Sequence, residues 1–177
     1  MHDCVKIMAT MTIRILTAYD ATIFWEIRLR GLKDDHLAFG TTYEESKDLT
    51  LETVRQRYFQ VAADNVILGA FEGDQLAGIT GIYREPKQKV RHKAAIWGVY
   101  VAPEYRGRGL AKKLMQAAID QARQWDGVAQ IGLVVYMGNQ SAYRLYQSLG
   151  FVTWGVEPNA LYWNHEYADD MYMALKL

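Results

Sequence analysis

The sequence predicts a single α/β domain built around a mixed β-sheet. Strand-like and helix-like segments alternate between residues 94 and 149, an order that favours parallel pairing of neighbouring strands. The segments on either side of this region are typical of strands that pair antiparallel. The chain has 177 residues, of which 50% are hydrophobic and 23% are charged, so it suits one domain with a sizeable core.

Hydrophobic periodicity places the individual elements. Apolar runs predict strands over residues 12–16, 65–71, 75–84, 94–101, 128–136, 151–156 and 171–177. Apolar residues at helical spacing predict helices over residues 17–33, 50–63, 110–125 and 139–149. We therefore expect a mixed sheet of six or seven strands flanked by about four helices, with a loop or broken helix over residues 34–49.

Short polar residues mark several of the predicted boundaries. Thr17 and Asp20 have the spacing of a capping pair, and Thr50 and Asn139 are suitable N-caps for the second and fourth helices. The Gly73-Asp74 pair predicts a hairpin turn between two strands. Residues 85–93 carry several Lys, Arg and His side chains and are typical of a solvated loop.

The composition argues against several classes of protein. Twenty Lys and Arg residues balance twenty Asp and Glu residues, so the chain lacks the basic excess that is typical of nucleic-acid-binding proteins. Cys4 is the single cysteine, which excludes an intrachain disulfide and a cysteine-based zinc site. The apolar stretches are shorter than the ~20 residues that cross a bilayer. We predict a cytoplasmic protein with no metal and no nucleic-acid or membrane partner.

The first ten residues are predicted to lie apart from the domain. Met1–Thr10 has no apolar core of signal-peptide length, and a second possible start, Met11, directly precedes the first strand-like segment. We predict that residues 1–10 are a leader outside the fold and that residues 11–177 form the domain.

A glycine-rich turn separates the strand at 94–101 from the helix at 110–125. It reads Arg106-Gly107-Arg108-Gly109-Leu110-Ala111. Glycines let the backbone approach a ligand closely, and a helix start offers unpaired N–H groups at the positive end of the helix dipole. With Lys112 and Lys113 just inside the helix, the segment predicts a phosphate or pyrophosphate pocket, although an ordinary strand–helix turn would also fit.

Two familiar phosphate-binding motifs do not match this turn. The dinucleotide fingerprint requires a third glycine where this chain has Lys112. The nucleotide-binding P-loop requires a Gly-Lys-Ser/Thr sequence, which the chain lacks. The predicted ligand is therefore a phosphate-bearing carrier of another kind.

A second motif runs from Asn139 to Phe151 and reads Asn-Gln-Ser-Ala-Tyr-Arg-Leu-Tyr-Gln-Ser-Leu-Gly-Phe. It predicts a capped helix with Ala142 and Tyr146 on its apolar face and Gly150 at its end. Tyr146 alone would also fit a core aromatic residue with its hydroxyl at the edge.

The two motifs, in this order, resemble those of the GNAT superfamily, the Gcn5-related N-acetyltransferases. The family's Arg/Gln-x-x-Gly-x-Gly/Ala loop is matched by Arg106, Gly109 and Ala111. Its Asn-x-x-Ala-x-x-x-Tyr helix, followed by Gly-Phe, is matched within residues 139–151. The order of elements resembles the family from residue 12 to residue 177, so the resemblance implies the GNAT acyl-CoA N-acyltransferase fold.

The resemblance also implies an acetyl-CoA site. The strand before the loop diverges from its parallel neighbour in that family, and its main chain would pair with the pantetheine arm as an added strand does. The loop backbone would hold the pyrophosphate, Asn139 would contact the arm, and Tyr146 would place its hydroxyl near the thioester sulfur. The implied cofactor-binding residues are Val99, Tyr100, Val101, Arg106, Gly107, Arg108, Gly109, Leu110, Ala111, Asn139, Ala142 and Tyr146.

By the same resemblance, a primary amine attacks the thioester of acetyl-CoA directly, and Tyr146 is the catalytic residue that protonates the departing thiolate. The acceptor would be a protein N-terminus, a lysine or another amine-bearing small molecule or peptide, and the enzyme would be a homodimer. Two alternatives stay open. The chain could be a non-catalytic module that binds an acyl-CoA as a sensor, or an enzyme that uses a longer acyl-CoA.

The sequence leaves the general base and the acceptor pocket unassigned. The best-known members carry a glutamate where this chain reads His92-Lys93-Ala94-Ala95. His92 lies in this region and could serve as the base, although a solvated loop histidine fits it better, and the other candidates, Glu72, Glu157 and His165, have no positional support. Aromatic candidates for the acceptor pocket, most of which fit the core equally well, are Phe39, Tyr43, Tyr83, Trp97, Trp154, Tyr162 and Trp163.

Overall fold

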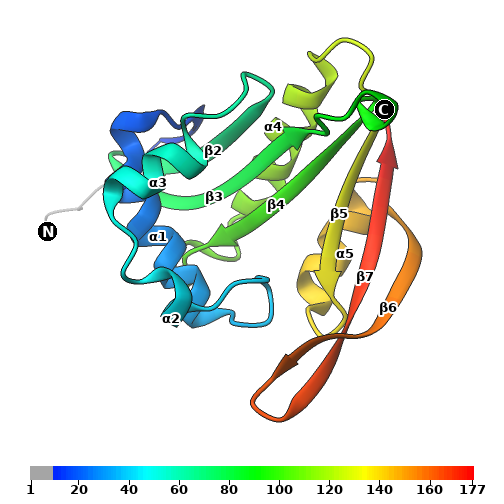
Figure 1. Ribbon diagram of the computed structural model, residues 1–177. Helices are drawn as coiled ribbons and strands as arrows, with labels where there is room; N and C mark the ends of the chain where they lie inside the picture. Colours follow the sequence, from blue (N-terminus) through cyan, green and yellow to red (C-terminus); the bar gives the residue numbers. More distant parts are fainter. Residues whose placement is uncertain (1–9) are drawn as a thin grey trace, which may run out of the picture.

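A computed structural model describes residues 10–177 of the chain and shows one seven-stranded sheet at its centre (Figure 1). The strands are β1 (Met11–Ile15), β2 (Asn65–Glu72), β3 (Gln75–Arg84), β4 (Lys93–Val101), β5 (Gln130–Tyr136), β6 (Val152–Trp163) and β7 (Glu166–Lys176). The α-helices are α1 (Ala21–Asp34), α2 (Tyr43–Ser46), α3 (Leu51–Tyr58), α4 (Leu110–Arg123) and α5 (Gln140–Ser148). The predicted mixed sheet is confirmed. The predicted leader, apart from Thr10, lies outside the described residues.

The sheet order is β1-β2-β3-β4-β5-β7-β6, and its one parallel pair lies at the centre. Strands β4 and β5 pair over only three positions, Lys93–Gln130, Ala94–Ile131 and Ala95–Gly132. All other neighbouring strands pair antiparallel. The expected central parallel pair is therefore confirmed, and it is short because the two strands diverge beyond Ala95 and Gly132 (Figure 1).

Helices cover both faces of the sheet and bury two apolar clusters. On one face, α4 and α5 pack against the sheet with Leu114, Met115 and Ile119 buried in the same cluster as Tyr146. On the other face, α1 and α3 enclose a cluster that contains Phe24 and Val54. Successive side chains of a strand point to opposite faces, so β2 and β3 contribute to both clusters.

The last two strands are longer than predicted, and this is the main correction to the expected fold. The apolar pattern predicted strands over 151–156 and 171–177, whereas β6 and β7 form a hairpin that projects from the sheet (Figure 1). Pro158 and the irregular pairing between Glu157 and Leu161 interrupt the apolar alternation on which the prediction depended. The turn uses Asn164 and His165, with φ of 50° and 66°, as a two-residue hairpin turn requires.

Helix α3 is shorter than predicted. Thr50 caps it as expected, with its side chain accepting a hydrogen bond from the Thr53 N–H at 3.2 Å. The helix ends at Tyr58 rather than near Ala63, because Phe59 leaves helical geometry and packs edge-on against Phe24 at 5.3 Å between ring centroids. The Thr17–Asp20 capping pair is also formed.

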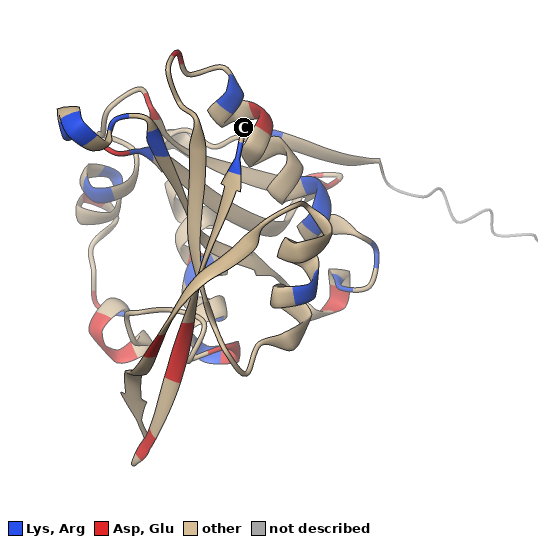
Figure 2. Cartoon of the chain, turned by 90° about the vertical axis from the view of Figure 1, so that its right-hand side faces the viewer, with Lys and Arg blue, Asp and Glu red and all other residues tan. Residues whose placement is uncertain are grey.

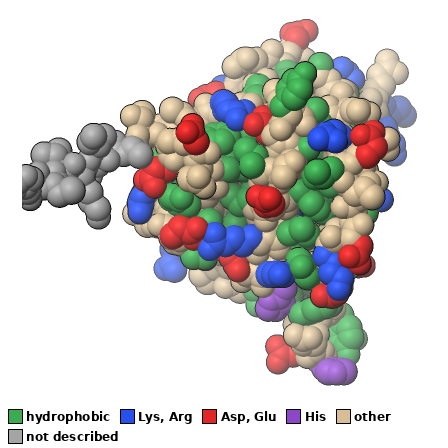
Figure 3. Space-filling model, turned by 90° about the vertical axis from the view of Figure 1, so that its left-hand side faces the viewer, with side chains coloured by type: hydrophobic (Ala, Val, Ile, Leu, Met, Phe, Trp, Pro, Cys, Tyr) green, Lys and Arg blue, Asp and Glu red, His purple; other side chains and the backbone are tan. Residues whose placement is uncertain are grey.

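The face of the molecule that carries α1 and α3 shows no region of a single charge among the described side chains (Figure 3). On the face that carries α1 and α3, acidic and basic side chains are interspersed with apolar ones (Figure 3). Within residues 10–177, no helix is long and apolar enough to cross a membrane.

Candidate active site

The divergence of β4 and β5 opens a cavity of about 500 Å³. Beyond Ala95, β4 has no ladder partner on its β5 side in the part of the chain that the structure describes. An irregularity in the β3–β4 pairing follows, where Gly98 adopts a φ of +66°. Such a bulge bends the strand and re-aims its side chains. The cavity therefore results from the sheet itself and not from a loop insertion.

We give names to two parts of the cavity lining: the cofactor end, where the family resemblance predicts the cofactor, and the acceptor end, the part beside α1. The cofactor end is the segment from Val99 to Ala111. The acceptor end is formed by Asp35, Ala38, Trp97 and Gly98. Of the twelve predicted cofactor-binding residues, all except Arg108 line the cavity.

At the cofactor end, two glycines of the turn adopt a left-handed backbone conformation. Gly107 and Gly109 have φ of 76° and 73°, in the left-handed region that residues with a Cβ rarely adopt. Gly109 is the N-cap of α4, so the unpaired N–H groups of this helix start lie beside the cavity. With Lys112 also lining the cavity, this end suits an anionic group such as a pyrophosphate.

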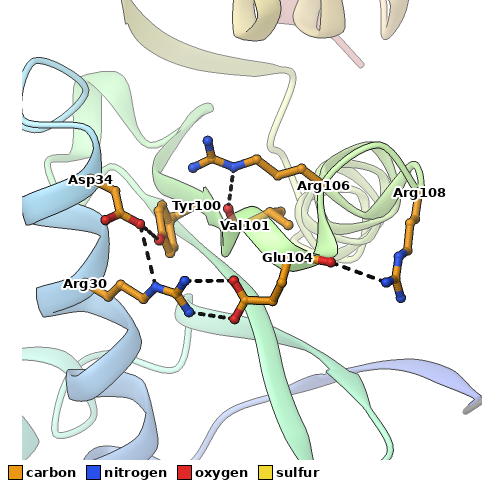
Figure 4. Close-up of polar contacts among 7 residues, drawn as sticks. All are labelled: Arg30, Asp34, Tyr100, Val101, Glu104, Arg106 and Arg108. Carbon is orange, nitrogen blue, oxygen red and sulfur yellow. Dashed lines mark hydrogen bonds and ion pairs between the residues drawn. The ribbon is translucent and has the colours of Figure 1, made fainter.

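The two arginines of the turn are engaged by the protein itself (Figure 4). Arg106 Nε donates to the Val101 carbonyl at 2.8 Å, and its guanidinium lies 5.7 Å from the Tyr100 ring centroid. Arg108 Nη1 contacts the Glu72 carboxylate at 2.7 Å, and Nη2 donates to the Glu104 carbonyl at 3.3 Å. These contacts hold the turn in place, and Arg108 turns its side chain away from the cavity.

A polar clamp ties α1 to this turn (Figure 4). Arg30 makes two parallel contacts with Glu104, both at 2.7 Å, and also lies 3.6 Å from Asp34. Asp34 accepts a hydrogen bond from the Tyr100 hydroxyl. Burial and the neighbouring Asp34 carboxylate raise the pKa of Tyr100. This phenol is therefore neutral and serves as a donor that orients the loop following α1.

Helix α5 brings Tyr146 to the cavity between its two ends. Asn139 caps the helix as predicted, because its side chain accepts from the Ala142 N–H at 3.1 Å. One turn further along, Tyr146 is buried, and its ring packs against Phe151 at 6.2 Å between centroids. Burial raises the pKa of the Tyr146 hydroxyl, and the nearby Asp35 carboxylate raises it further. The phenol is therefore neutral near pH 7 and can donate a proton or a hydrogen bond.

Asp35 is the acidic residue of this site that sequence reasoning missed. It follows the last residue of α1, lines the cavity and is half-buried. Burial raises the pKa of its carboxyl, an effect opposed by Arg106 and His36. One signal was available in the sequence. Asp34 and Asp35 lie at a helix C-terminus, where the helix dipole disfavours negative charge, so their placement calls for another explanation.

The base candidates considered from the sequence do not line the cavity. Glu72 is paired with Arg108, and Glu157 accepts a hydrogen bond from Tyr172 on the β6–β7 hairpin. His165 occupies the hairpin turn, and His92 lies in the loop before β4. Asp35, in contrast to these four residues, lines the cavity.

The aromatic candidates for an acceptor pocket are mostly dispersed. Trp97 lines the acceptor end of the cavity, and Phe39 is buried in the cluster behind it. Trp163 lies 6.4 Å from His36 between ring centroids, in a second, smaller pocket of about 110 Å³. Tyr43, Tyr83, Trp154 and Tyr162 do not line the main cavity.

The β6–β7 hairpin carries acidic residues on the part that projects from the sheet (Figure 2). Glu157 and Asp170 face each other in the ladder. Partial burial and the Glu157 carboxylate raise the pKa of Asp170. This side of the molecule is therefore acidic, in contrast to the basic turn at the cofactor end.

Comparison with known proteins agrees with this geometry. The chain matches the model of the acetyltransferase (GNAT) family over residues 31–151. An L-amino acid N-acetyltransferase of Escherichia coli (strain K12) is 29% identical over 109 residues. That alignment covers 61% of this chain and 65% of the relative, less than two thirds of either protein.

Solved structures share the fold over almost the whole chain. A GNAT-family acetyltransferase from Streptococcus pneumoniae has a TM-score of 0.82 at 23% identity and covers 95% of this chain and 100% of its own. A Salmonella typhimurium protein assigned as an acetyltransferase, and solved with its cofactor acetyl-CoA, has a TM-score of 0.75 at 22% identity, with 94% of each chain covered. Because the family model spans more than half of the chain and the folds agree, this protein belongs to the GNAT family of acetyltransferases.

Proposed function

We propose that the protein transfers the acetyl group of acetyl-CoA to a primary amine by direct attack on the thioester. The observation that carries this proposal is a single cavity that joins three features. These are the left-handed glycine turn at the start of α4, the buried hydroxyl of Tyr146 and the half-buried carboxylate of Asp35. A protein that only binds acyl-CoA needs the first feature but has no need of the other two.

The residues of the cofactor end fit the cosubstrate. A Cβ on Gly107 or Gly109 would meet open space, so a ligand can approach the main chain there directly. The N–H groups at the start of α4 and the Lys112 side chain would hold the pyrophosphate. The unpaired edge of β4 near Val99 would accept the pantetheine arm as a strand partner. When bound, acetyl-CoA supplies an activated acyl group with a good leaving group.

In the reaction, the ammonium group of the acceptor must lose two protons, and the departing sulfur must gain one. A lysine-like ammonium group has a pKa of ~10.4 and must lose a proton before it attacks. Asp35 is the residue that we assign as the acceptor of this proton, directly or through one water molecule. The amine nitrogen then bonds to the acyl carbon, the carbon–sulfur bond breaks, and the Tyr146 hydroxyl donates its proton to the departing sulfur. The nitrogen gives up its second proton, which returns through water to the Tyr146 oxygen, and Asp35 releases to solvent the proton that it took from the ammonium group. The products are the N-acetylated amine and CoA.

Release of free CoA thiol across a panel of amines tests the proposal. The panel contains peptides with free N-termini, lysine peptides, polyamines, amino acids and aminoglycosides, together with a blank without acceptor. Amino acids belong in it because the Escherichia coli relative acts on them by name. We expect acceptor-dependent release above the blank that is lost in Tyr146→Phe. Tight acetyl-CoA binding without release for any amine would favour the sensor function instead.

Three further properties stay predictions. The homodimer is checked by sedimentation, the cytoplasmic location by fractionation, and the preference for acetyl over longer acyl groups by repeating the assay with a series of acyl-CoA thioesters.

A further inference from the structure

One cation of this protein, Arg28, lies inside the fold without a counter-ion among residues 10–177. Arg28 is on the inner face of α1, between Phe24 and Leu32, and only 7% of its surface is exposed. Its Nε and Nη1 atoms are buried and make no hydrogen bond within residues 10–177. The ion pairs formed in the described part of the chain do not include it. A buried charge in this state is costly, so its retention needs a reason.

The surroundings of Arg28 stabilise the cation only in part. Its guanidinium carbon lies 4.3 Å from the Phe39 ring centroid and 5.8 Å from that of Trp97. Burial lowers the pKa of the guanidinium, and Tyr58 partly offsets that effect. Aromatic faces attract a cation, yet they do not replace the acceptors that the N–H groups at the edge of the guanidinium require.

The guanidinium adjoins the acceptor end of the cavity. Gly98 lines that end, and a Cβ placed on Gly98 would lie 3.4 Å from Arg28 Nη1. Trp97 also contacts both the guanidinium and the cavity. Phe39 follows Ala38, which lines the same end, and belongs to the loop between α1 and α2. Arg28 therefore lies just behind the cavity wall at the acceptor end.

We propose that Arg28 binds a carboxylate group of the acceptor, so that the substrate is a small amine that also carries a carboxylate, as an amino acid does. This inference rests on the proposed acetyl transfer and names its substrate class. The planar guanidinium matches a carboxylate in two parallel hydrogen bonds. The ligand must be small because the guanidinium is enclosed, and the proposal requires the Phe39 ring to shift so that the ligand reaches Arg28 beside Gly98. Asp35, on the same cavity, then faces the ammonium group of the acceptor.

Ligand binding without turnover provides the first test. Thermal unfolding of the full chain is followed with N-acetyl amino acids and with the corresponding carboxamides, for leucine, methionine, phenylalanine and glutamate. We expect at least one acid to raise the melting temperature while its amide does not. Arg28→Gln should abolish this difference, and Arg57→Met, an exposed arginine on α3, should preserve it. Equal shifts for acids and amides in the wild-type protein would refute the proposal.

Acceptor kinetics provide the second test. We expect kcat/KM of the wild-type enzyme for the preferred amino acid to exceed that for its carboxamide by about tenfold or more. Arg28→Gln should reduce the ratio to below about twofold, mainly through KM. Efficient transfer to amines with no preference for the carboxylate would overturn this inference and leave the acetyltransferase function intact. If Arg28→Gln does not fold, the acid-to-amide ratio of the wild-type enzyme decides the question alone.

Discussion

The two ends of the cavity are built in different ways. The cofactor end comes largely from one continuous stretch, from Val99 through the turn to Ala111, and the groups that we propose for cofactor binding there are mostly main-chain atoms. The acceptor end combines α1, the loop after it and the bulge of β4, segments that are far apart in the sequence. A site built from the backbone of consecutive residues can be recognised as a motif in the sequence. A site built from side chains that are far apart in the sequence cannot.

The electrostatics of the two ends differ in the same sense. The turn carries basic residues that support anion binding, and two of them are held by Glu72 and the Val101 carbonyl. The acceptor end instead carries an acidic group, Asp35, which lines the cavity, and a buried cation, Arg28, behind its wall, which no residue of the described chain neutralises. Unbalanced charges of this kind cost stability, and they concentrate at sites that bind a charged substrate.

The largest expected effect comes from the residue between the two ends. Tyr146→Phe should lower kcat by about 10² or more, because the departing sulfur loses its proton donor. The affinity for acetyl-CoA should stay within about twofold, since the ring and its packing are kept. Tyr143→Phe, on the same helix, is the matched control. An unchanged rate in Tyr146→Phe would assign this tyrosine to packing alone.

The next largest effect should separate the cofactor end from the rest of the site. Gly109→Val places a β-branched residue at a φ of 73°, which costs about 1–3 kcal/mol of strain or displaces the backbone N–H groups. We expect the Kd for CoA to rise by about tenfold or more. Gly155→Val is the control, because Gly155 lies in β6 with open space around it and no positive φ. Calorimetric titration that finds wild-type affinity would remove the turn from the binding site.

A pH profile should reveal the role of Asp35 at the acceptor end. Asp35→Asn should reduce kcat/KM at pH 7 by about tenfold or more. The loss should shrink as the pH approaches the pKa of the acceptor amine, which is ~10.4 for a lysine-like amine. The substitution should also raise the melting temperature at pH 7. Because burial raises the pKa of this carboxyl, folding is favoured by its neutral form, and this contribution is lost as the pH rises through the raised pKa.

Asp48→Asn is the control for that experiment, because Asp48 is an exposed residue between α2 and α3 and does not line the cavity. A loss of activity that is the same at every pH would show that Asp35 positions the acceptor and does not take its proton.

A smaller effect is expected for the clamp that links α1 to the turn. Glu104→Gln breaks the paired contacts with Arg30 at 2.7 Å. Both side chains are exposed, so solvent and salt screen the interaction, and the melting temperature should fall by about 2 °C or less. A fall of this size that disappears in 1 M salt would identify the clamp as electrostatic. A large loss of CoA affinity would instead show that the clamp shapes the cofactor end.

The smallest effect should follow removal of residues 1–10, because every residue known to line the cavity is retained. Strand β1 begins at Met11, so the paired part of the sheet is retained. We expect unchanged CoA binding and an unchanged melting temperature. A fall of more than about 5 °C in a thermal scan would contradict the prediction that this segment is a leader.

Much of the fold was predictable because local signals agreed with one another. The hairpin at Gly73, the helix caps at Thr17, Thr50 and Asn139, and the single parallel pair all followed from short-range patterns. The long β6–β7 hairpin was not predictable in full. None of the residues from Glu157 to Asp170 is fully buried, so the sequence there carries little apolar alternation, and the pairing depends on the two strands meeting each other.

By itself, the sequence determined the class of fold, and it predicted a set of cofactor-binding residues of which all except Arg108 line the cavity. Glycines and a helix start act through their own backbone, so their chemistry is encoded within a few consecutive residues. Only the tertiary structure decided the acceptor end. Arg28 interrupts the apolar face of α1, and Asp35 directly follows that helix. Neither residue indicates a site in the sequence, because only the folded chain places Gly98 beside Arg28 and on the same cavity as Asp35. The physical reason is that the free energy of a buried charge depends on the groups packed around it, and these groups come together only when the chain folds.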